Sequence, residues 1–160
     1  MKRSSLVILM VLLLPAAGLL AQSRAEKLND FTLELGGKCL LYSMAYQRMI
    51  GEMAGLEVGL SYFGGASEGE GVGVFFLSGG ARLYLTKKNA SPCLSGGIVY
   101  VSAGTDAGPF GEDSSSGVYF YASPGFEFRM SSGFLFRGSV NFIIKNGFFV
   151  WPGLTLGIAF

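Results

Sequence analysis

The last eight residues of the sequence, 153–160, alternate strictly between two kinds of side chain. Leu154, Leu156, Ile158 and Phe160 fall on one face of an extended chain, and only small or weakly polar residues fall on the other. A half-buried strand of a soluble sheet also alternates, but this segment places a large aromatic residue at its very end. A lipid-facing strand that closes a barrel against the first strand accounts for both features. The segment therefore predicts a transmembrane β-barrel.

The same alternation recurs from residue 31 onward. In each stretch, large apolar residues on one face oppose glycine, small polar or charged residues on the other, which is the two-residue period of a β-strand. The pattern predicts an all-β, antiparallel, up-and-down barrel. Its predicted strands cover residues 31–35, 40–46, 56–62, 75–85, 94–103, 119–129, 134–145 and 153–160.

The strand number depends on Gly36 and Gly37, after which the first alternation resumes on the opposite parity. The two glycines either form a tight hairpin, which gives eight strands, or a bulge within one strand, which gives seven. Bacterial outer-membrane barrels have an even number of strands, short periplasmic turns and longer outer loops. We therefore predict eight strands.

The predicted connections follow that asymmetry. Short turns near Ile50, Thr86 and Ser131 alternate with connections of varied length at Gly36, 64–71, 106–117 and 146–151. If the barrel domain begins and ends in the periplasm, the short turns lie on the periplasmic side. Pro124 falls inside a predicted strand and cannot donate a ladder hydrogen bond, so we predict a bulge there.

Alternation alone does not say which face lines the lumen. A soluble, lipocalin-like periplasmic carrier of an apolar ligand would keep its apolar side chains inside and its polar ones outside. Here the face with the largest aromatics is nearly free of charge, which favours the opposite, membrane arrangement. The other face predicts a polar network in the lumen. Its charged members are Glu57, Arg82, Glu127, Arg129 and Arg137.

An eight-stranded barrel leaves a lumen only just wide enough for side chains. Ionised groups there must be paired, because burying an unpaired charge is prohibitively unfavourable. We therefore predict a packed plug of ion pairs and hydrogen bonds; a narrow, gated transport pore is the alternative. Further polar members of the predicted plug are Ser43, Gln47, Tyr84, Tyr119, Tyr121 and Asn141.

Residues 30–160 as a whole resemble the small eight-stranded outer-membrane barrels of the OmpA/OmpX type. Residues 34–46 also look like the opening of outer-membrane barrel proteins without an assigned role. The resemblance implies a location in the bacterial outer membrane, surrounded by its lipid. It also implies that the barrel-assembly machinery acts on the C-terminal signal, whose apolar residues end at Phe160. It does not choose a role, because this architecture carries adhesins, lipid-modifying enzymes and structural anchors.

Residues 1–21 have the features of a cleaved secretory signal peptide. Lys2 and Arg3 precede a short apolar run, and small residues follow up to Ala21. The run is shorter than the roughly 20 apolar residues of a spanning helix; an uncleaved anchor is the alternative. Residues 22–29 are predicted to form a periplasmic lead-in and residues 30–160 the barrel domain. Cys39 and Cys93 are predicted near opposite ends of the barrel, which favours two separate thiols over a disulfide.

The residues that could carry chemistry are few. The sequence has no histidine, which excludes His-dependent catalysis and imidazole metal sites. Two distant cysteines make no metal site, and nucleotide-binding fingerprints are absent. A net charge of +1 gives no electrostatic case for nucleic acid. We therefore predict no enzyme activity, cofactor or metal, and a structural or surface-interaction role.

The predicted outer loops are the region through which an extracellular partner would bind. Their acidic residues are read as a solvated surface, with weak divalent-cation or host-surface contact as the alternative. These residues are Glu68, Glu70, Asp106, Glu112 and Asp113. An outer interfacial girdle of aromatic side chains is also predicted. Its members are Tyr62, Tyr100, Phe148, Phe149 and Trp151.

Overall fold

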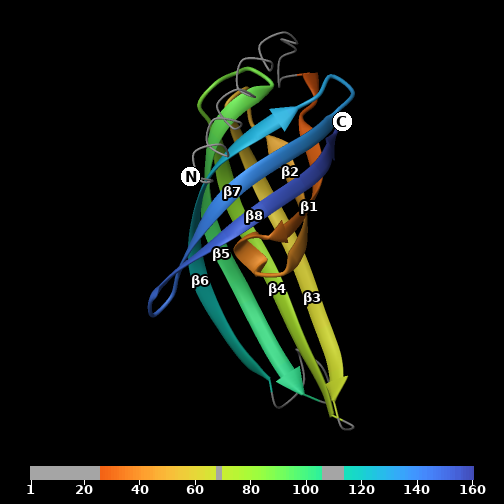
Figure 1. The fold of residues 1–160 in the computed structure, drawn as a ribbon, viewed down its shortest axis with the longest axis vertical. Helices are drawn as coiled ribbons and strands as arrows, with labels where there is room; N and C mark the ends of the chain where they lie inside the picture. Colours follow the sequence, from red (N-terminus) through yellow and green to blue (C-terminus); the bar gives the residue numbers. More distant parts are fainter. Residues whose placement is uncertain (1–25, 68–69, 106–113) are drawn as a thin grey trace, which may run out of the picture.

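The computed structural model describes residues 26–67, 70–105 and 114–160, and it forms a closed barrel of eight antiparallel strands (Figure 1). Each strand pairs with its neighbours in sequence, and the first pairs with the last. The predicted strand number and fold class are therefore confirmed. The strands are β1 (Asn29–Gly36), β2 (Tyr42–Met49), β3 (Ala54–Ser67), β4 (Glu70–Tyr84), β5 (Ala90–Thr105), β6 (Ser115–Arg129), β7 (Phe134–Ile144) and β8 (Phe148–Ala159), and a 3-10 turn, η3 (Gly37–Cys39), lies between β1 and β2.

The two ends of the barrel differ. At one end, here called the turn end, lie three short connections over residues 50–53, 85–89 and 130–133, together with Phe160. At the other, the mouth end, lie η3, the β3–β4 and β5–β6 connections and the β7–β8 turn. Strands β3–β6 have 14 to 16 residues, whereas β1 and β2 have eight each. One side of the barrel therefore extends well beyond η3 and the β7–β8 turn at the mouth end (Figure 1).

The outward face of the barrel is apolar, and its inward face is polar over much of its length. In β1, the side chains of Phe31, Leu33 and Leu35 are exposed, whereas Asp30 and Glu34 are buried. The same alternation holds in β2 and β3, and Leu154, Leu156, Ile158 and Phe160 all point outward as predicted. This arrangement is the reverse of the one expected for a lipocalin-like carrier. The facing inferred from the charge distribution is confirmed.

The glycine-rich segment 64–71 does not form the long loop that its composition predicts. The β3–β4 ladder continues through Gly64↔Gly73 as far as Ser67↔Glu70. Backbone pairing needs no side chain, and two facing strands that are both rich in small residues can stay paired where apolar alternation has ended. The loop prediction was wrong because composition reports turn preference, whereas the ladder depends on the partner strand.

Several other strand ends also lie beyond the predicted limits, and three of them differ by four residues or more. β5 begins at Ala90, β6 begins at Ser115, and β8 begins at Phe148, inside the connection predicted over 146–151. Pro124 causes no bulge: the β6–β7 pairs Ala122↔Phe142 and Gly125↔Ser139 keep one register across it. The proline removes its own hydrogen bond without inserting an extra residue.

The N-terminal predictions lie mostly outside the described residues. Residues 1–25 are not described, so the signal peptide stays a prediction, and β1 begins at Asn29, one residue before the predicted barrel boundary. No helix among the described residues has the length and apolar character needed to cross a membrane.

Candidate functional site: the barrel lumen

Among the side chains that the structure describes, eight charged ones are buried, and they belong to a network in the part of the lumen nearer the turn end. Four are acidic and four are basic, so their formal charges cancel. All five predicted network residues belong to this set, together with three that the prediction did not place there. The eight are Asp30, Glu34, Lys38, Glu57, Arg82, Glu127, Arg129 and Arg137.

Glu127 is the acceptor at the centre of one half of the network. Arg137 donates to its Oε2 from Nη2 at 2.6 Å and from Nε at 2.9 Å, a paired geometry that charge-assisted hydrogen bonds favour. The hydroxyl of Tyr84 donates to the same oxygen at 3.0 Å, and Arg129 Nη2 lies 3.3 Å from Oε1. Arg129 also donates to Asp30 Oδ2 at 2.6 Å.

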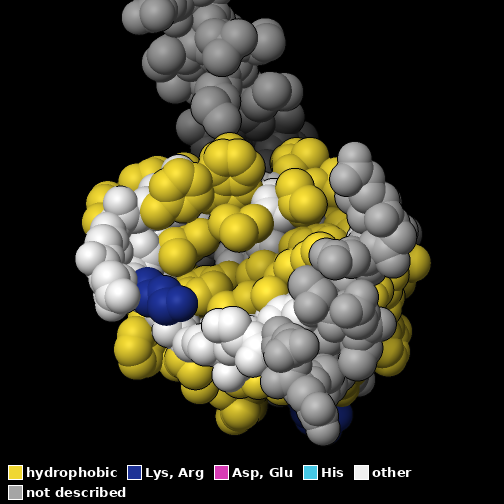
Figure 2. Space-filling view, turned by 90° about the horizontal axis from the view of Figure 1, so that it is seen from below, with side chains coloured by type: hydrophobic (Ala, Val, Ile, Leu, Met, Phe, Trp, Pro, Cys, Tyr) yellow, Lys and Arg dark blue, Asp and Glu magenta, His cyan; other side chains and the backbone are white. Residues whose placement is uncertain are grey.

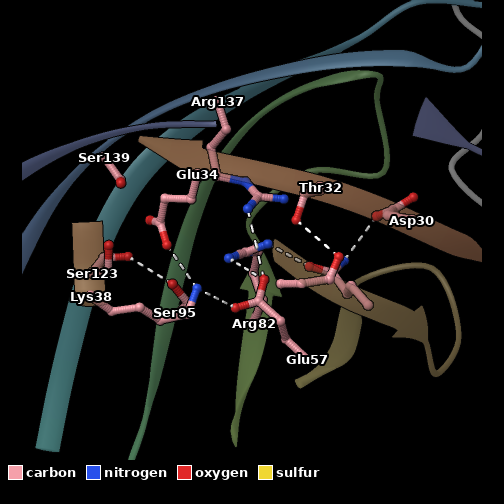
Figure 3. Close-up of polar contacts among 12 residues, drawn as sticks. Asp30, Thr32, Glu34, Lys38, Glu57, Arg82, Ser95, Ser123, Arg137 and Ser139 are labelled. Atoms are coloured by element: carbon pink, nitrogen blue, oxygen red, sulfur yellow. Dashed lines mark hydrogen bonds and ion pairs between the residues drawn. The ribbon is translucent and has the colours of Figure 1, made fainter. Parts of the chain in front are cut away.

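Glu57 is the centre of the other half. Lys38 Nζ lies 2.8 Å from Glu57 Oε1 and Arg82 Nη2 lies 2.9 Å from Oε2 (Figure 3). Arg137 Nη1 lies 3.9 Å from Oε2, which connects the two halves. Gln47 adds a second link, because it accepts a hydrogen bond from Arg82 and donates to Asp30 at 3.2 Å. The charged groups therefore form one connected set across the lumen.

Lys38 enters this network from η3. Gly36 and Gly37 adopt left-handed φ angles of 71° and 73°, which glycine tolerates, and they turn the chain inward. Lys38 is 3% exposed, and its Nζ lies 2.9 Å from Glu34 Oε2 as well as near Glu57. Two carboxylates therefore compensate the charge of this buried ammonium group.

The β1–β2 connection is held in this inward position by hydrogen bonds to its backbone. The hydroxyl of Tyr119, on β6, donates to the carbonyl oxygen of Lys38. Trp151 Nε1, on β8, donates to the carbonyl oxygen of Leu40 at 2.8 Å. Leu40 itself has a φ of 73°, an uncommon conformation for a residue with a side chain. The tight hairpin predicted at the two glycines is therefore a longer connection that is folded into the lumen.

Among the described residues, the part of the lumen nearer the mouth holds no buried charge and is largely apolar, although Ser61 and Ser102 are buried there. Phe76, Val99, Tyr119 and Tyr121 form a buried cluster there with Cys39. Above it is an open cavity of about 470 Å³, here called the mouth pocket, whose lining contains only apolar residues. Figure 2 views the molecule from the mouth end and shows this hollow lined by hydrophobic side chains. The lining residues are Leu40, Leu41, Phe63, Val74, Phe76, Phe149 and Trp151.

Two residues of the predicted aromatic girdle belong to the mouth pocket. Phe149 and Trp151 stack on each other with ring centroids 5.5 Å apart, and both line the pocket. They pair with Ile143 and Asn141, which have inward parity on β7. Placing them in an outer girdle was wrong because the predicted loop over 146–151 hid the parity of these residues. The other three predicted girdle residues all have exposed side chains; they are Tyr62, Tyr100 and Phe148.

The two cysteines lie at different levels of the lumen, and no disulfide joins them. Cys39 belongs to the cluster near the mouth, and Cys93 packs with Met49 and Tyr84 near the turn end. Among the described residues, no group of three or more His, Cys, Asp or Glu side chains could hold a metal ion. Of the acidic loop residues, Glu68, Asp106, Glu112 and Asp113 lie outside the described residues, and the side chain of Glu70 is not described either.

The sequence matches no protein-family model and no curated protein. Its fold does have solved counterparts. The N-terminal β-barrel domain of Pseudomonas aeruginosa OprF matches with a TM-score of 0.61 at 12% identity, over 82% of this chain and 95% of that one. The chain has the fold of the small eight-stranded outer-membrane barrels.

Two structures of the attachment invasion locus protein Ail of Yersinia pestis also match this barrel fold. Their TM-scores are 0.45 and 0.48 at 12% and 13% identity, over 82% of this chain and 91% and 92% of theirs. One of the two is a complex with the heparin analogue sucrose octasulfate.

Proposed function

We propose that this protein is an integral outer-membrane barrel with a structural or surface-interaction role and a lumen closed by its own side chains. The observation that carries the proposal is the distribution of side chains: of the charged strand residues whose side chains are described, all but Arg48 are buried inside, while large apolar residues cover the outside. In water, such a continuous apolar surface would drive association. Lipid solvates it, and the charges inside are paired with one another.

The network supports closure of the lumen rather than conduction. Glu57 and Glu127 each accept from basic or hydroxyl groups on two other elements of the fold. Arg137 of β7 also lies 3.9 Å from Glu57 of β3, so the network ties opposite walls together. Lys38 adds the β1–β2 connection to this network and draws it across the lumen. Moving an ion through would require several buried ion pairs to separate, each with a large desolvation cost.

The surface role is supported by the unequal height of the barrel wall. The mouth ends of β3–β6 lie furthest from the turn end (Figure 1). If the turn end is periplasmic, as in other outer-membrane barrels, these strand ends face the medium and carry the β3–β4 and β5–β6 connections. They are the regions through which an extracellular partner would bind.

The location is tested by cell fractionation and by gel mobility of the membrane fraction, unheated against boiled. We expect outer-membrane localisation and a shift in mobility on boiling, because a closed barrel resists detergent until it is heated. Recovery in the soluble periplasmic fraction without a shift would contradict the proposal.

Closure of the lumen is tested by reconstituting the same protein in a planar bilayer. We expect a conductance at the baseline of the protein-free membrane. Steady channels would instead establish the narrow pore.

We also propose that residues 1–21 direct secretion and that the barrel-assembly machinery acts on the last strand. Phe160 points outward at the end of β8, and its backbone pairs with Asn29 of β1. Deleting Phe160 should lower the amount of heat-shiftable barrel in the outer membrane, while Phe134→Ala, which removes an outward aromatic near the same end, should leave it unchanged. Equal amounts of wild type and deletion variant would refute this.

A further inference from the structure

The mouth pocket has the size and lining of a site for an apolar molecule. Its volume of about 470 Å³ lies in the lower half of the range of roughly 300–1,000 Å³ found for small-molecule pockets. No polar atom contributes to its lining. A sugar or a hydrated ion would lose its hydrogen bonds to water there and gain none from the protein.

The floor of the pocket separates it from the charged network. Leu40 and Leu41, which follow η3, contribute to the lining, whereas Lys38 lies below them with its ammonium group on Glu34 and Glu57. Lys38 also lies 5.8 Å from the centre of the Tyr121 ring. Its charge is therefore already neutralised and does not serve the pocket.

One cation lies at the rim of the mouth. Lys145 is exposed in the β7–β8 turn, and its Nζ lies 2.8 Å from the position that a Cβ atom would take at Gly117 of β6. Gly117 lies two residues from the buried Tyr119 in the same strand, so a Cβ atom there would point into the lumen. Lys145 directly follows the end of β7, whose Ile143 pairs with Phe149 of the pocket lining. Among the residues that the structure describes, Lys145 forms no ion pair.

We propose that the mouth pocket binds an anionic amphiphile with a single hydrocarbon chain, of the fatty-acid class. The chain occupies the apolar pocket, and the carboxylate lies at the rim with the ammonium group of Lys145. The volume favours one chain over the several chains of a membrane lipid. The charge at the rim, set against a lining without any charge, favours an anionic head over a neutral or cationic one.

Trp151 makes this site directly observable. It is the only tryptophan of the sequence, and it lines the pocket. A ligand that carries a heavy-atom quencher in its chain therefore reports its own arrival by quenching the fluorescence of a single residue. The full-length mature protein in lipid nanodiscs is titrated with 9,10-dibromostearic acid and, in parallel, with the corresponding neutral dibromo alcohol.

We expect saturable quenching of the wild type by the dibromo acid. Val74→Asp places a carboxylate in the lining, and it should weaken binding of both probes at least tenfold because the new charge resists desolvation. The matched control Val72→Asp lies two residues along the same strand and outside the lining, and it should bind as the wild type does.

Lys145→Gln tests the head group. It should weaken the dibromo acid about threefold to fivefold, as expected for one exposed ion pair, and leave the neutral alcohol unchanged. Its control is Lys87→Gln, which removes an exposed lysine at the turn end. Every variant is first shown to be closed by its gel shift on boiling. Should Val74→Asp fail to fold, Val74→Phe fills the same space without a charge.

Three results would overturn the proposal. Quenching that rises linearly with the acid and is the same in the pocket variants would show simple partition into the bilayer. If the acid bound to the wild type and to Lys145→Gln with equal affinity, recognition of an anionic head group by Lys145 would be refuted. Quenching by brominated phospholipid of the disc alone, lost in the pocket variants, would show that a bilayer lipid occupies the pocket. None of these outcomes depends on closure of the lumen, which the conductance experiment tests separately.

Discussion

The two halves of the lumen are lined by the same strands but by different kinds of side chain. Near the turn end, eight charged side chains with cancelling formal charges pair across the barrel. Near the mouth, inward positions of the same strands carry aromatic and aliphatic residues, and a cavity of about 470 Å³ lies above them. In β4, for example, Arg82 and Phe76 face the same lumen at different levels.

The difference shows what each half contributes. A network of buried ion pairs has exacting geometry, because a carboxylate that loses one partner is left uncompensated in a region without water. An apolar lining requires less exact geometry than ion pairs do and can leave space unfilled. The charged half therefore fixes the barrel, and the apolar half is where a ligand can be accommodated. The predictions below follow this contrast, from the largest expected effect to the smallest.

Glu127→Ala should be the most destabilising single change in the lumen. It leaves Arg137, Arg129 and Tyr84 without their shared acceptor, and we expect a loss of about 3–5 kcal/mol in the free energy of unfolding. Urea unfolding in lipid, followed by gel shift, measures it. Conductance should remain at baseline because Glu57 and its partners still cross the lumen. A loss below about 1 kcal/mol, the range of exposed pairs, would refute the contrast.

Lys38→Ala should lower the free energy of unfolding somewhat less, by about 2–4 kcal/mol in the same measurement. The substitution leaves the carboxylate of Glu34 without its ion pair, but Glu57 keeps its ion pair with Arg82 at 2.9 Å. Lys87→Ala is the control, since this lysine is 66% exposed at the turn end and should contribute little. Similar losses in both variants would mean that η3 does not depend on the network.

Phe76→Ala tests the apolar half. A buried phenylalanine usually contributes about 3–5 kcal/mol relative to alanine, but Phe76 already borders the mouth pocket and has fewer neighbours on that side. We expect a loss of about 2 kcal/mol, obtained from the urea midpoint. A loss as large as that of Glu127→Ala would show that the two halves are equally well packed.

Glu52→Ala should have the smallest effect. Its pair with Lys87 lies in the solvent-exposed β2–β3 and β4–β5 turns, where a single ion pair contributes less than about 1 kcal/mol. Thermal unfolding at low and high salt provides the check, since raising the ionic strength should abolish any difference in stability between the wild type and Glu52→Ala. A salt-independent loss would contradict this assignment.

The fold could be predicted because the alternation of apolar and polar residues distinguishes the outward face of each strand from its inward face. The same alternation identified Glu57, Arg82, Glu127, Arg129 and Arg137 as inward residues, and the structure brings them together. Glu34 has the same parity in β1 and was available to that reasoning, whereas Asp30 lay at the predicted strand boundary.

Lys38 and the mouth pocket could not be predicted in this way. Lys38 lies in a 3-10 turn, where the period of two does not apply, and it enters the lumen only because left-handed glycines turn the chain. The pocket brings Leu40 and Leu41, which follow η3, together with residues of β3, β4 and β8, and no local pattern reports how high each strand rises around the mouth. In glycine-rich ladders such as β3–β4, the apolar alternation ends before the strand does, so the length of the strand cannot be predicted from it.

The pairing of β1 with β8 has a consequence for the order of folding. Asn29 and Phe160 exchange backbone hydrogen bonds of 3.0 and 2.8 Å, although 131 positions separate them in sequence. The other seven ladders join consecutive strands and can form one after another, but this one must wait until the whole sheet is in place. Until then the sheet has two open edges, each a row of unpaired backbone groups able to capture another chain. Closing this last ladder removes both edges in a single step.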